Sequence, residues 1–212
     1  MDIDNLLFHC EHPKIIKTKS GQTMAVSCGK CIPCLVDKCR SRASLIHAES
    51  DYHTYRVFVT LTYSPEHVPT MDYYYDDFHV AHFIDSETKE CLGELKISKR
   101  KLLSIQAKSS DNKLHYARFS DAQKFLKRLR KHLKKYYNET IRYYIVSEYG
   151  PKTFRPHYHA VIFFDSAYVF GDFGKILSKT WSLGHFDYSQ SRGGASNYVA
   201  SYINSYVNIP VV

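Results

Sequence analysis

One ten-residue stretch, Arg155 to Phe164, constrains the fold of this chain more than any other. Its apolar run from Ala160 to Phe164 is typical of a strand buried in the middle of a sheet. Because successive side chains of a strand point to opposite faces, His157 and His159 should share one face while Tyr158 lies on the other. Two imidazoles side by side can bind one metal ion. The alternative is that they are ordinary polar side chains at a strand end.

A second strand is predicted from Ile141 to Tyr149, joined to the histidine strand by a turn that contains Gly150. So short a connection joins antiparallel neighbours, which brings Glu148 close to the two histidines. One carboxylate and two imidazoles make a three-ligand site with open positions, and the oxygen ligand suits Mg²⁺ or Mn²⁺. The alternative is that Glu148 is an ordinary acid at a sheet edge, paired with Arg155.

A strongly basic helix is expected from Ser120 to about Tyr137, with Ser120 as its N-cap. Its apolar stripe predicts one buried face, formed by Phe125, Leu126, Leu129 and Leu133. No acidic residue falls between Lys124 and Tyr137 to balance the basic side chains. Like charges repel one another, which favours a phosphate backbone as their partner over a merely solvated face. The DNA-binding candidates are Lys124, Lys127, Arg128 and Lys131 from this helix, with Arg155 beyond it.

Five of the six cysteines lie near the N-terminus: Cys10, Cys28, Cys31, Cys34 and Cys39. The spacing Cys-x2-Cys-x2-Cys presents several sulfurs from one tight loop, which suits a thiolate-bound metal. Zinc is favoured over an iron–sulfur cluster because Cys39 comes four residues after Cys34 and is not followed by proline. The expected zinc set is Cys28, Cys31 and Cys34 with either Cys10 or Cys39. The alternative is a group of reduced, unliganded thiols.

The other expected elements are less sharply defined. We expect a helix over residues 35–53, a strand from Arg56 to Tyr63, a short helix from Phe173 to Thr180 and a strand near 181–188. Residues 66–118 are interpreted as an insertion with hairpin character, with short strands near 79–84 and 92–97. A final helix, capped by Ser196 or Asn197, carries Tyr198, Tyr202 and Tyr206 on one face. In isolation, a tyrosine stripe at this spacing is more often core packing than catalysis.

The composition favours nucleic acid as the partner. A formal charge of +8 together with 18 tyrosines indicates a polyanion with faces to stack on. No apolar stretch approaches the roughly 18–20 residues that span a bilayer, and the acidic N-terminus is not typical of a signal peptide. Cysteines without a secretory signal favour thiols or metal ligands over disulfides, so we expect a single cytosolic domain.

Three motifs, in this order along the chain, resemble those of the HUH endonucleases that start rolling-circle replication. Val59 to Tyr63 resembles the first motif, a core strand; Arg155 to His159 resembles the metal-binding second; Tyr198 to Tyr202 resembles the third, which carries the nucleophile. The sequence is most similar to the replication initiators of gokushovirus-type microviruses, which are small single-stranded DNA bacteriophages. That similarity extends to Cys28–Cys34, Phe125–Lys131, Glu148–Gly150 and the pair Trp181 and Gly184.

The resemblance implies a nicking and joining reaction on single-stranded DNA at a phage origin, with an origin hairpin or stem-loop as the target. His157, His159 and Glu148 would hold one Mg²⁺ or Mn²⁺ ion. Tyr198 or Tyr202 would attack the scissile phosphate, leaving a 5′-phosphotyrosyl link and a 3′-OH that primes synthesis. The host polymerase and helicase would be partners, and the bacterial cytoplasm the place of action.

The resemblance also implies an α+β fold: an antiparallel central sheet of about five strands with helices on one face, in a ferredoxin-like or RRM-like core. The DNA groove would lie on the open face. Residues 1–212 would form one HUH domain, with 1–40 as a zinc-stabilised flank and 66–118 as an insertion. Two rival interpretations stay open: a non-catalytic nucleic-acid-binding zinc protein, and a metal-dependent hydrolase that uses activated water.

Overall fold

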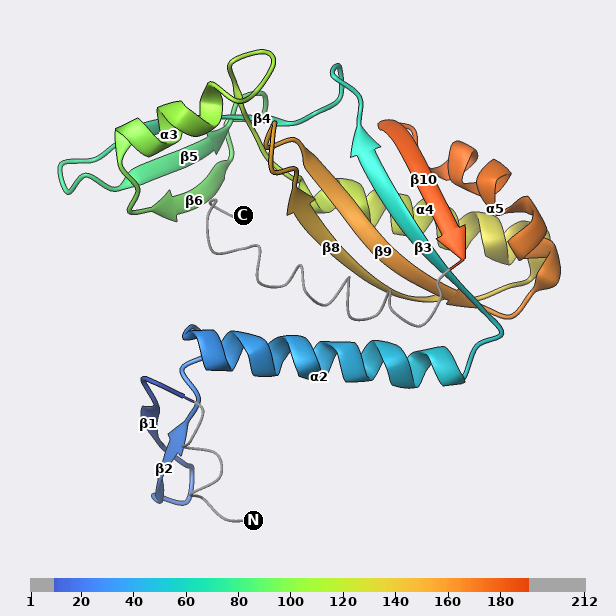
Figure 1. The fold of residues 1–212 in the computed structure, drawn as a ribbon, viewed down its shortest axis with the longest axis horizontal. Coiled ribbons are helices and arrows are strands. Elements are labelled where there is room, and N and C mark those ends of the chain that lie inside the picture. The colour runs from blue at the N-terminus through green and yellow to red at the C-terminus, as the bar shows by residue number, and fades with distance from the viewer. Residues whose placement is uncertain (1–9, 191–212) are drawn as a thin grey trace.

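The computed structural model describes residues 10–190, which form two lobes and an N-terminal arm (Figure 1). In chain order the elements are β1 (Lys14–Lys17), β2 (Thr23–Val26), α2 (Ile32–Asp51), β3 (Tyr55–Tyr63), β4 (Thr70–Tyr75), β5 (Ala81–Asp85), β6 (Cys91–Leu95), α3 (Lys99–Gln106), β7 (Leu114–His115), α4 (Phe119–Tyr137), β8 (Arg142–Tyr149), β9 (Pro156–Phe164), α5 (Ala167–Thr180) and β10 (Gly184–Gln190).

The larger lobe is built on an antiparallel sheet in the order β10-β3-β9-β8. The histidine strand β9 lies between two others, and all of its residues except His157 are buried. The prediction of a central, buried strand is therefore confirmed, as are the α+β class and the antiparallel central sheet. Within residues 10–190 this sheet has four strands, where about five were expected.

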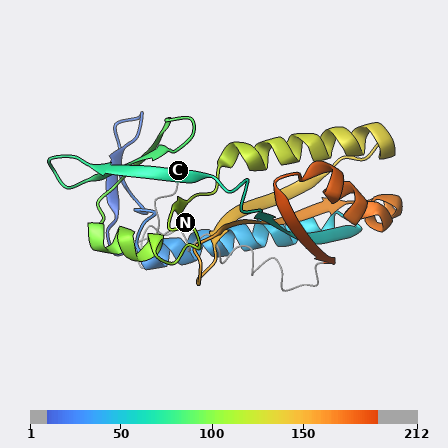
Figure 2. The ribbon, with the colours of Figure 1, turned by 90° about the horizontal axis from the view of Figure 1, so that it is seen from above.

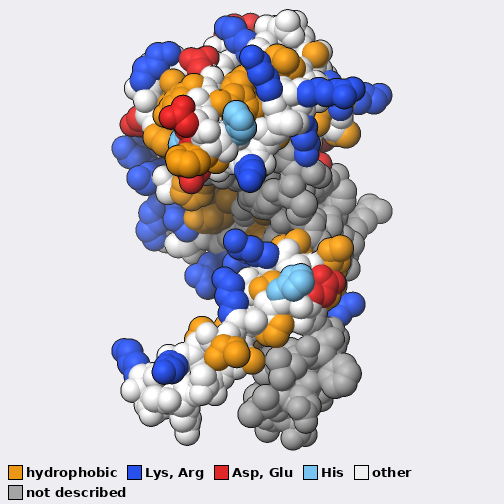
Figure 3. Space-filling model, turned by 90° about the vertical axis from the view of Figure 1, so that its left-hand side faces the viewer, with side chains coloured by type: hydrophobic (Ala, Val, Ile, Leu, Met, Phe, Trp, Pro, Cys, Tyr) orange, Lys and Arg blue, Asp and Glu red, His pale blue; other side chains and the backbone are white. Residues whose placement is uncertain are grey.

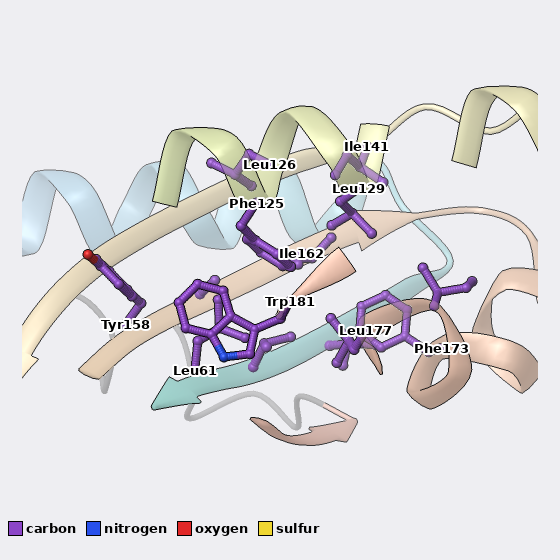
Figure 4. Close-up of a cluster of buried hydrophobic side chains, with 14 of the residues drawn as sticks. Leu61, Phe125, Leu126, Leu129, Ile141, Tyr158, Ile162, Phe173, Leu177 and Trp181 are labelled. Atoms are coloured by element: carbon purple, nitrogen blue, oxygen red, sulfur yellow. The ribbon is translucent and has the colours of Figure 1, made fainter. Parts of the chain in front are cut away.

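Helices α4 and α5 cover one face of this sheet. Phe125 and Leu129 of α4 and Phe173 of α5 are fully buried against Leu61 and Ile162 of the strands. Figure 4 shows Trp181 and Phe125 gathered with Leu61 between the strands and α4. Burying such a set of large apolar side chains contributes roughly 1.5–3 kcal/mol for each one, so this layer dominates the stability of the lobe.

The opposite face of the sheet is contacted by α2. Ile46 is buried against Val146, Val161 and Phe163, and Glu49 forms a 3.1 Å ion pair with Arg142 at the edge of the contact. Figure 2 shows α4 along one side of the sheet, with α2 away from it. The helices are thus not confined to one face as expected, because the C-terminal half of α2 has an apolar residue to bury there.

The smaller lobe has its own sheet, in the order β6-β5-β4-β7, and its own apolar core with α3. The segment expected to be an insertion with hairpin character is therefore a sheet with a packed helix. Arg118 links it to the larger lobe, because its Nη2 lies 2.6 Å from the Asp85 carboxylate while its carbonyl accepts a hydrogen bond from Tyr158. Burial alone would raise the pKa of Asp85, but hydrogen bonds from Tyr116, Thr88 and Arg118 hold that pKa well below its usual range.

Two helix starts differ from the expectation. Arg118, and not Ser120, occupies the N-cap of α4, which begins at Phe119. Helix α5 begins at Ala167, earlier than the expected Phe173, because Ser166 caps it by accepting a 3.3 Å hydrogen bond from the Val169 N–H. The apolar pattern locates the buried face of a helix better than its first turn, which depends on the cap.

Gly184 is predicted to be essential for stability, because β10 begins there at φ +152° against the end of β3. A Cβ atom would lie 2.3 Å from both the Ser64 nitrogen and the Thr62 oxygen, and both are backbone atoms. Gly184→Ala should therefore lower the free energy of unfolding by about 2 kcal/mol or more in urea denaturation. The matched control is Gly171→Ala in α5, where nothing lies within 4 Å, and Ala should stabilise the helix by roughly 0.5–1 kcal/mol. Equal effects of the two substitutions would contradict the prediction.

Candidate active site

The two histidines of β9 lie on the face of the sheet opposite α4 and α5. In the register of the sheet, His157 is flanked by Thr62 of β3 and Glu148 of β8, while His159 is flanked by Thr60 and Val146. Tyr158 points to the other face, where its hydroxyl donates a 2.8 Å hydrogen bond to the Arg118 carbonyl. The predicted alternation of these three side chains is confirmed.

Each imidazole is held by a threonine of the neighbouring strand. His157 Nδ1 lies 3.0 Å from Thr62 Oγ1, and His159 Nδ1 lies 3.1 Å from Thr60 Oγ1. The His159 ring also stacks on Phe58, with centroids 5.5 Å apart. Bonding at Nδ1 fixes the orientation of each ring and leaves Nε2 as the ligand atom, which is how outer-shell groups position metal-binding histidines.

Glu148 lies beside the histidines, as expected. Its Oε2 is 2.7 Å from His159 Nε2, whereas the Arg155 guanidinium donates to the Tyr63 carbonyl at 2.6 Å. Glu148 is therefore an acid bonded to a site histidine, and its alternative role as a partner of Arg155 is not supported.

This donor set fits a divalent metal ion. Burial lowers the pKa of His157, with the neighbouring His159 and Arg155 adding to the effect. Burial also lowers the pKa of His159, against an opposing contribution from Glu148. Both rings are thus kept neutral at neutral pH, the state in which imidazole binds metals. A Cβ atom at Gly150 would lie 3.3 Å from His157 Nε2, so the absence of a side chain there keeps space beside that ligand atom.

Sequence reasoning missed several polar residues on this face. Thr60 and Thr62 belong to the first motif but were interpreted only as strand residues. His185 and Asp187 of β10 pair with Thr62 and Thr60, so the same face extends to them, and both are exposed. The signal was available, because the Thr-x-Thr and His-x-Asp patterns have the same two-residue period as the histidine pair.

The candidate DNA-binding residues of α4 lie on the other side of the sheet from the histidines. Lys124, Lys127 and Lys131 are exposed, but α4 packs on the face into which Tyr158 points. Arg128 is exposed too, although its Nε donates a 2.8 Å hydrogen bond to the Thr180 carbonyl at the end of α5. The structure does not bring these residues together with the histidines, because the sheet lies between them.

Arg155 lies next to the histidines but has a structural contact of its own. It is half-buried, and its bond to the Tyr63 carbonyl holds the end of β3 against the start of β9. On the histidine side of the sheet, α2 carries the exposed basic residues Lys38, Arg40 and Arg42, which were interpreted as an ordinary charged face. Figure 3 shows Lys and Arg side chains spread over the second lobe and the N-terminal segment, with few acidic side chains between them.

The structure gathers four of the candidate zinc ligands. The sulfurs of Cys10, Cys28, Cys31 and Cys34 all lie within 4.8 Å of one another, which selects Cys10 over Cys39 as the fourth member. Hydrogen bonds from the Lys30 and Cys31 backbone N–H groups lower the pKa of Cys28 to about 6, whereas its bond with Cys31 raises the pKa of Cys34 to about 12. The group thus combines an easily ionised thiol with one that retains its proton.

The candidate nucleophiles Tyr198 and Tyr202 lie outside the described residues, as does Tyr206. Strand β10, the last described element, ends at Gln190 opposite Val57 of β3. Among residues 10–190, no helix combines the length and apolar character needed to span a bilayer.

Comparisons with known proteins identify relatives for most of the chain. Residues 103–206 match the family model of replication-associated protein ORF2. The chain is 24% identical over 196 residues to replication-associated protein VP4 of Bdellovibrio phage phiMH2K, covering 87% of this chain and 50% of that protein. It is 26% identical over 192 residues to replication-associated protein ORF2 of Spiroplasma virus 4, covering 84% and 47%.

The chain thus spans about half the length of the curated relatives it matches. No solved structure matches it. The matched region contains α4, β8, β9 and β10, and so includes both histidines and Glu148. On this match and on the motifs that β3 and β9 carry, residues 103–206 belong to the family of replication-associated protein ORF2, and the chain as a whole resembles the rolling-circle replication initiators of phages.

Proposed function

We propose that this protein is a replication-initiation endonuclease that nicks and rejoins single-stranded DNA at a phage origin through a 5′-phosphotyrosyl intermediate. The observation that carries the proposal is the pair of neutral imidazoles on one face of β9, each held at Nδ1 by a threonine, with Glu148 against His159. The similarity to phage replication-associated proteins supports the same activity.

In this proposal His157, His159 and Glu148 hold one Mg²⁺ or Mn²⁺ ion. Such an ion, when bound, supplies a Lewis acid that polarises the scissile phosphate and offsets the charge that develops on its oxygens. Thr60 and Thr62 keep the two rings in place, and Arg155 holds the neighbouring strand end. These groups fix the phosphate in position, and positioning contributes a large share of the rate enhancement in phosphoryl transfer.

The nucleophile in this proposal is Tyr198 or Tyr202. Its phenolic oxygen attacks the phosphorus and loses its proton, the bond from phosphorus to the 3′ oxygen breaks, and that oxygen is protonated to a 3′-OH. A second transesterification by the released 3′-OH reverses the bond changes and rejoins the strand. The phosphotyrosyl bond conserves the energy of the phosphodiester, so no other energy source is needed.

Tyrosines closer to the histidines in sequence are poor candidates for this role. Tyr158 is 3% exposed, points into the core and has a pKa raised above its ordinary value by burial. Tyr63 is fully buried and bonded to Asp121, and burial raises its pKa as well. A buried phenol that cannot ionise cannot attack DNA in solvent, so the nucleophile must come from another segment.

Chain length permits Tyr198 and Tyr202 to reach the site. Gln190 pairs with Val57, whereas His157 pairs with Thr62 five residues further along β3, which is about 17 Å away along the strand. Tyr198 follows Gln190 by eight residues, and eight residues extend to at most about 26–29 Å. Either tyrosine can therefore approach the histidines without any rearrangement of β10.

Exposed basic side chains on α2 and α4 supply the electrostatic attraction that single-stranded DNA needs in this proposal. The bacterial host's polymerase would extend the 3′-OH and its helicase would open the duplex. The site of action would be the bacterial cytoplasm.

The test is incubation of the protein with a labelled single-stranded oligonucleotide that carries the phage origin stem-loop, with Mn²⁺ or Mg²⁺. We expect a protein–DNA adduct that survives a denaturing gel and disappears when EDTA is added. Metal-dependent cleavage with repeated turnover and no adduct would instead indicate a hydrolase that uses water. Binding without cleavage in any divalent ion would indicate a non-catalytic binding module.

A further inference from the structure

The N-terminal arm lacks an apolar core of its own. Strand β1 is exposed throughout, and Ile15 and Ile16 are 76% and 44% exposed. Across residues 10–31 the side chains classed as buried are those of Cys10 and Cys31, which pack with Cys34 and Cys28. A two-stranded hairpin of this size is marginal in water, and small modules of this kind are usually stabilised by a disulfide or a metal.

The four sulfurs are spaced for one metal ion. The Sγ–Sγ distances are 3.9 Å between Cys28 and Cys34 and 4.0 Å between Cys10 and Cys31, and no pair exceeds 4.8 Å. A tetrahedral zinc ion with bonds of about 2.3 Å places its sulfurs about 3.8 Å apart. These sulfurs already lie close to that arrangement.

The backbone around the cysteines has the turn that such a site needs. The N–H groups of Lys30 and Cys31 donate to Cys28 Sγ at 3.4 Å, and the Cys28 N–H donates to Cys10 Sγ at 3.2 Å. Gly29 has a φ of +72°, which lets the chain fold its N–H groups back over the sulfur. N–H donors of this kind stabilise thiolates rather than neutral thiols.

We propose that Cys10, Cys28, Cys31 and Cys34 bind one structural Zn²⁺ ion, and that this ion attaches the β1–β2 hairpin to the first turn of α2. Cys31 is the N-cap of α2 and Cys34 lies in its first turn, so the metal joins the hairpin directly to the helix. Four thiolates in a tetrahedron select zinc over Mg²⁺ or Mn²⁺, which prefer oxygen. A multinuclear iron–sulfur cluster needs its cysteines wider apart than these.

The first test is metal content after purification of the full chain under reducing conditions. We expect one zinc per chain, and Co²⁺ exchanged into the site should give the visible absorption of a tetrahedral cobalt–thiolate centre. Cys28→Ser and Cys34→Ser should each lower zinc affinity at least about 100-fold. Cys39→Ser and Cys91→Ser are the matched controls, because neither residue belongs to the group, and both should retain full zinc content.

The second test measures what the ion does to the fold. Stripping zinc with a strong chelator should make residues 10–34 sensitive to limited proteolysis while the β10-β3-β9-β8 lobe stays resistant. Protein that contains no zinc, iron in place of zinc, or zinc retained by a Cys28→Ser, Cys34→Ser double variant would each overturn the proposal. These measurements need neither DNA nor cleavage, so their outcome is independent of the proposed nicking activity.

Discussion

Replacing both Tyr198 and Tyr202 with phenylalanine should abolish the covalent protein–DNA adduct, a loss of at least about 10³-fold in nicking. The substitutions remove only two hydroxyl oxygens, so stacking and charge attraction are unchanged, and the affinity for single-stranded DNA should stay within about threefold. The measurement is adduct formation on a denaturing gel, with binding measured by fluorescence anisotropy on the same oligonucleotide.

Single variants and a control sharpen this prediction. Each single Tyr→Phe variant keeps one nucleophile, and the variant that loses the first cut identifies the leading tyrosine. Tyr206→Phe is the matched control, because it removes the same atom from a tyrosine four residues further along and should leave nicking unchanged. Full activity in the double variant would reject both residues as nucleophiles.

His157→Ala should lower metal-dependent nicking by about 10³-fold while leaving DNA affinity nearly unchanged. The imidazole is one of three ligands, whereas DNA affinity is distributed over many basic and aromatic groups. Mn²⁺ affinity, measured by calorimetry, should fall in parallel with nicking. His47→Ala is the matched control, because His47 is exposed on α2 and lies outside the site. Equal loss of binding and nicking would point to a structural histidine.

The pH dependence of the wild-type reaction follows from the same residues. Metal binding requires neutral imidazoles, and burial lowers the pKa of both His157 and His159 below the ordinary imidazole value. Protons therefore compete with the metal only at acidic pH. Mn²⁺ affinity should be level around neutral pH and should fall as the pH drops through the lowered pKa values, which a calorimetric titration series can measure.

Much of the larger lobe could be predicted because its signals are local. The apolar run of β9 predicted a buried central strand, and the short turn before it predicted the antiparallel pairing that brings Glu148 to His159. The two-residue period of a strand placed both histidines on one face. The cysteine spacing likewise predicted a group of sulfurs, and the structure chose Cys10 over Cys39 from the alternatives left open.

Local pattern could not say which face of the sheet each helix covers. The stripe on α4 predicted that the helix is buried on one side, yet only packing places that side against the Tyr158 face, away from the histidines. The roles of Arg128 and Arg155 were misjudged for a related reason. A basic side chain in a basic segment was interpreted as a DNA contact, whereas each donates a hydrogen bond to a carbonyl of a distant segment.

By itself, the sequence determined which residues form the sheet, which side chains share a face and which atoms can bind metal, because these depend on spacing along one element and its neighbour. Only the tertiary structure decided that Thr60 and Thr62 hold the two imidazoles, that α2 and α4 lie on opposite faces, and that Cys10 completes the sulfur group. The physical reason is that these contacts join segments far apart in the chain, and their geometry is set by how whole layers pack rather than by any local period.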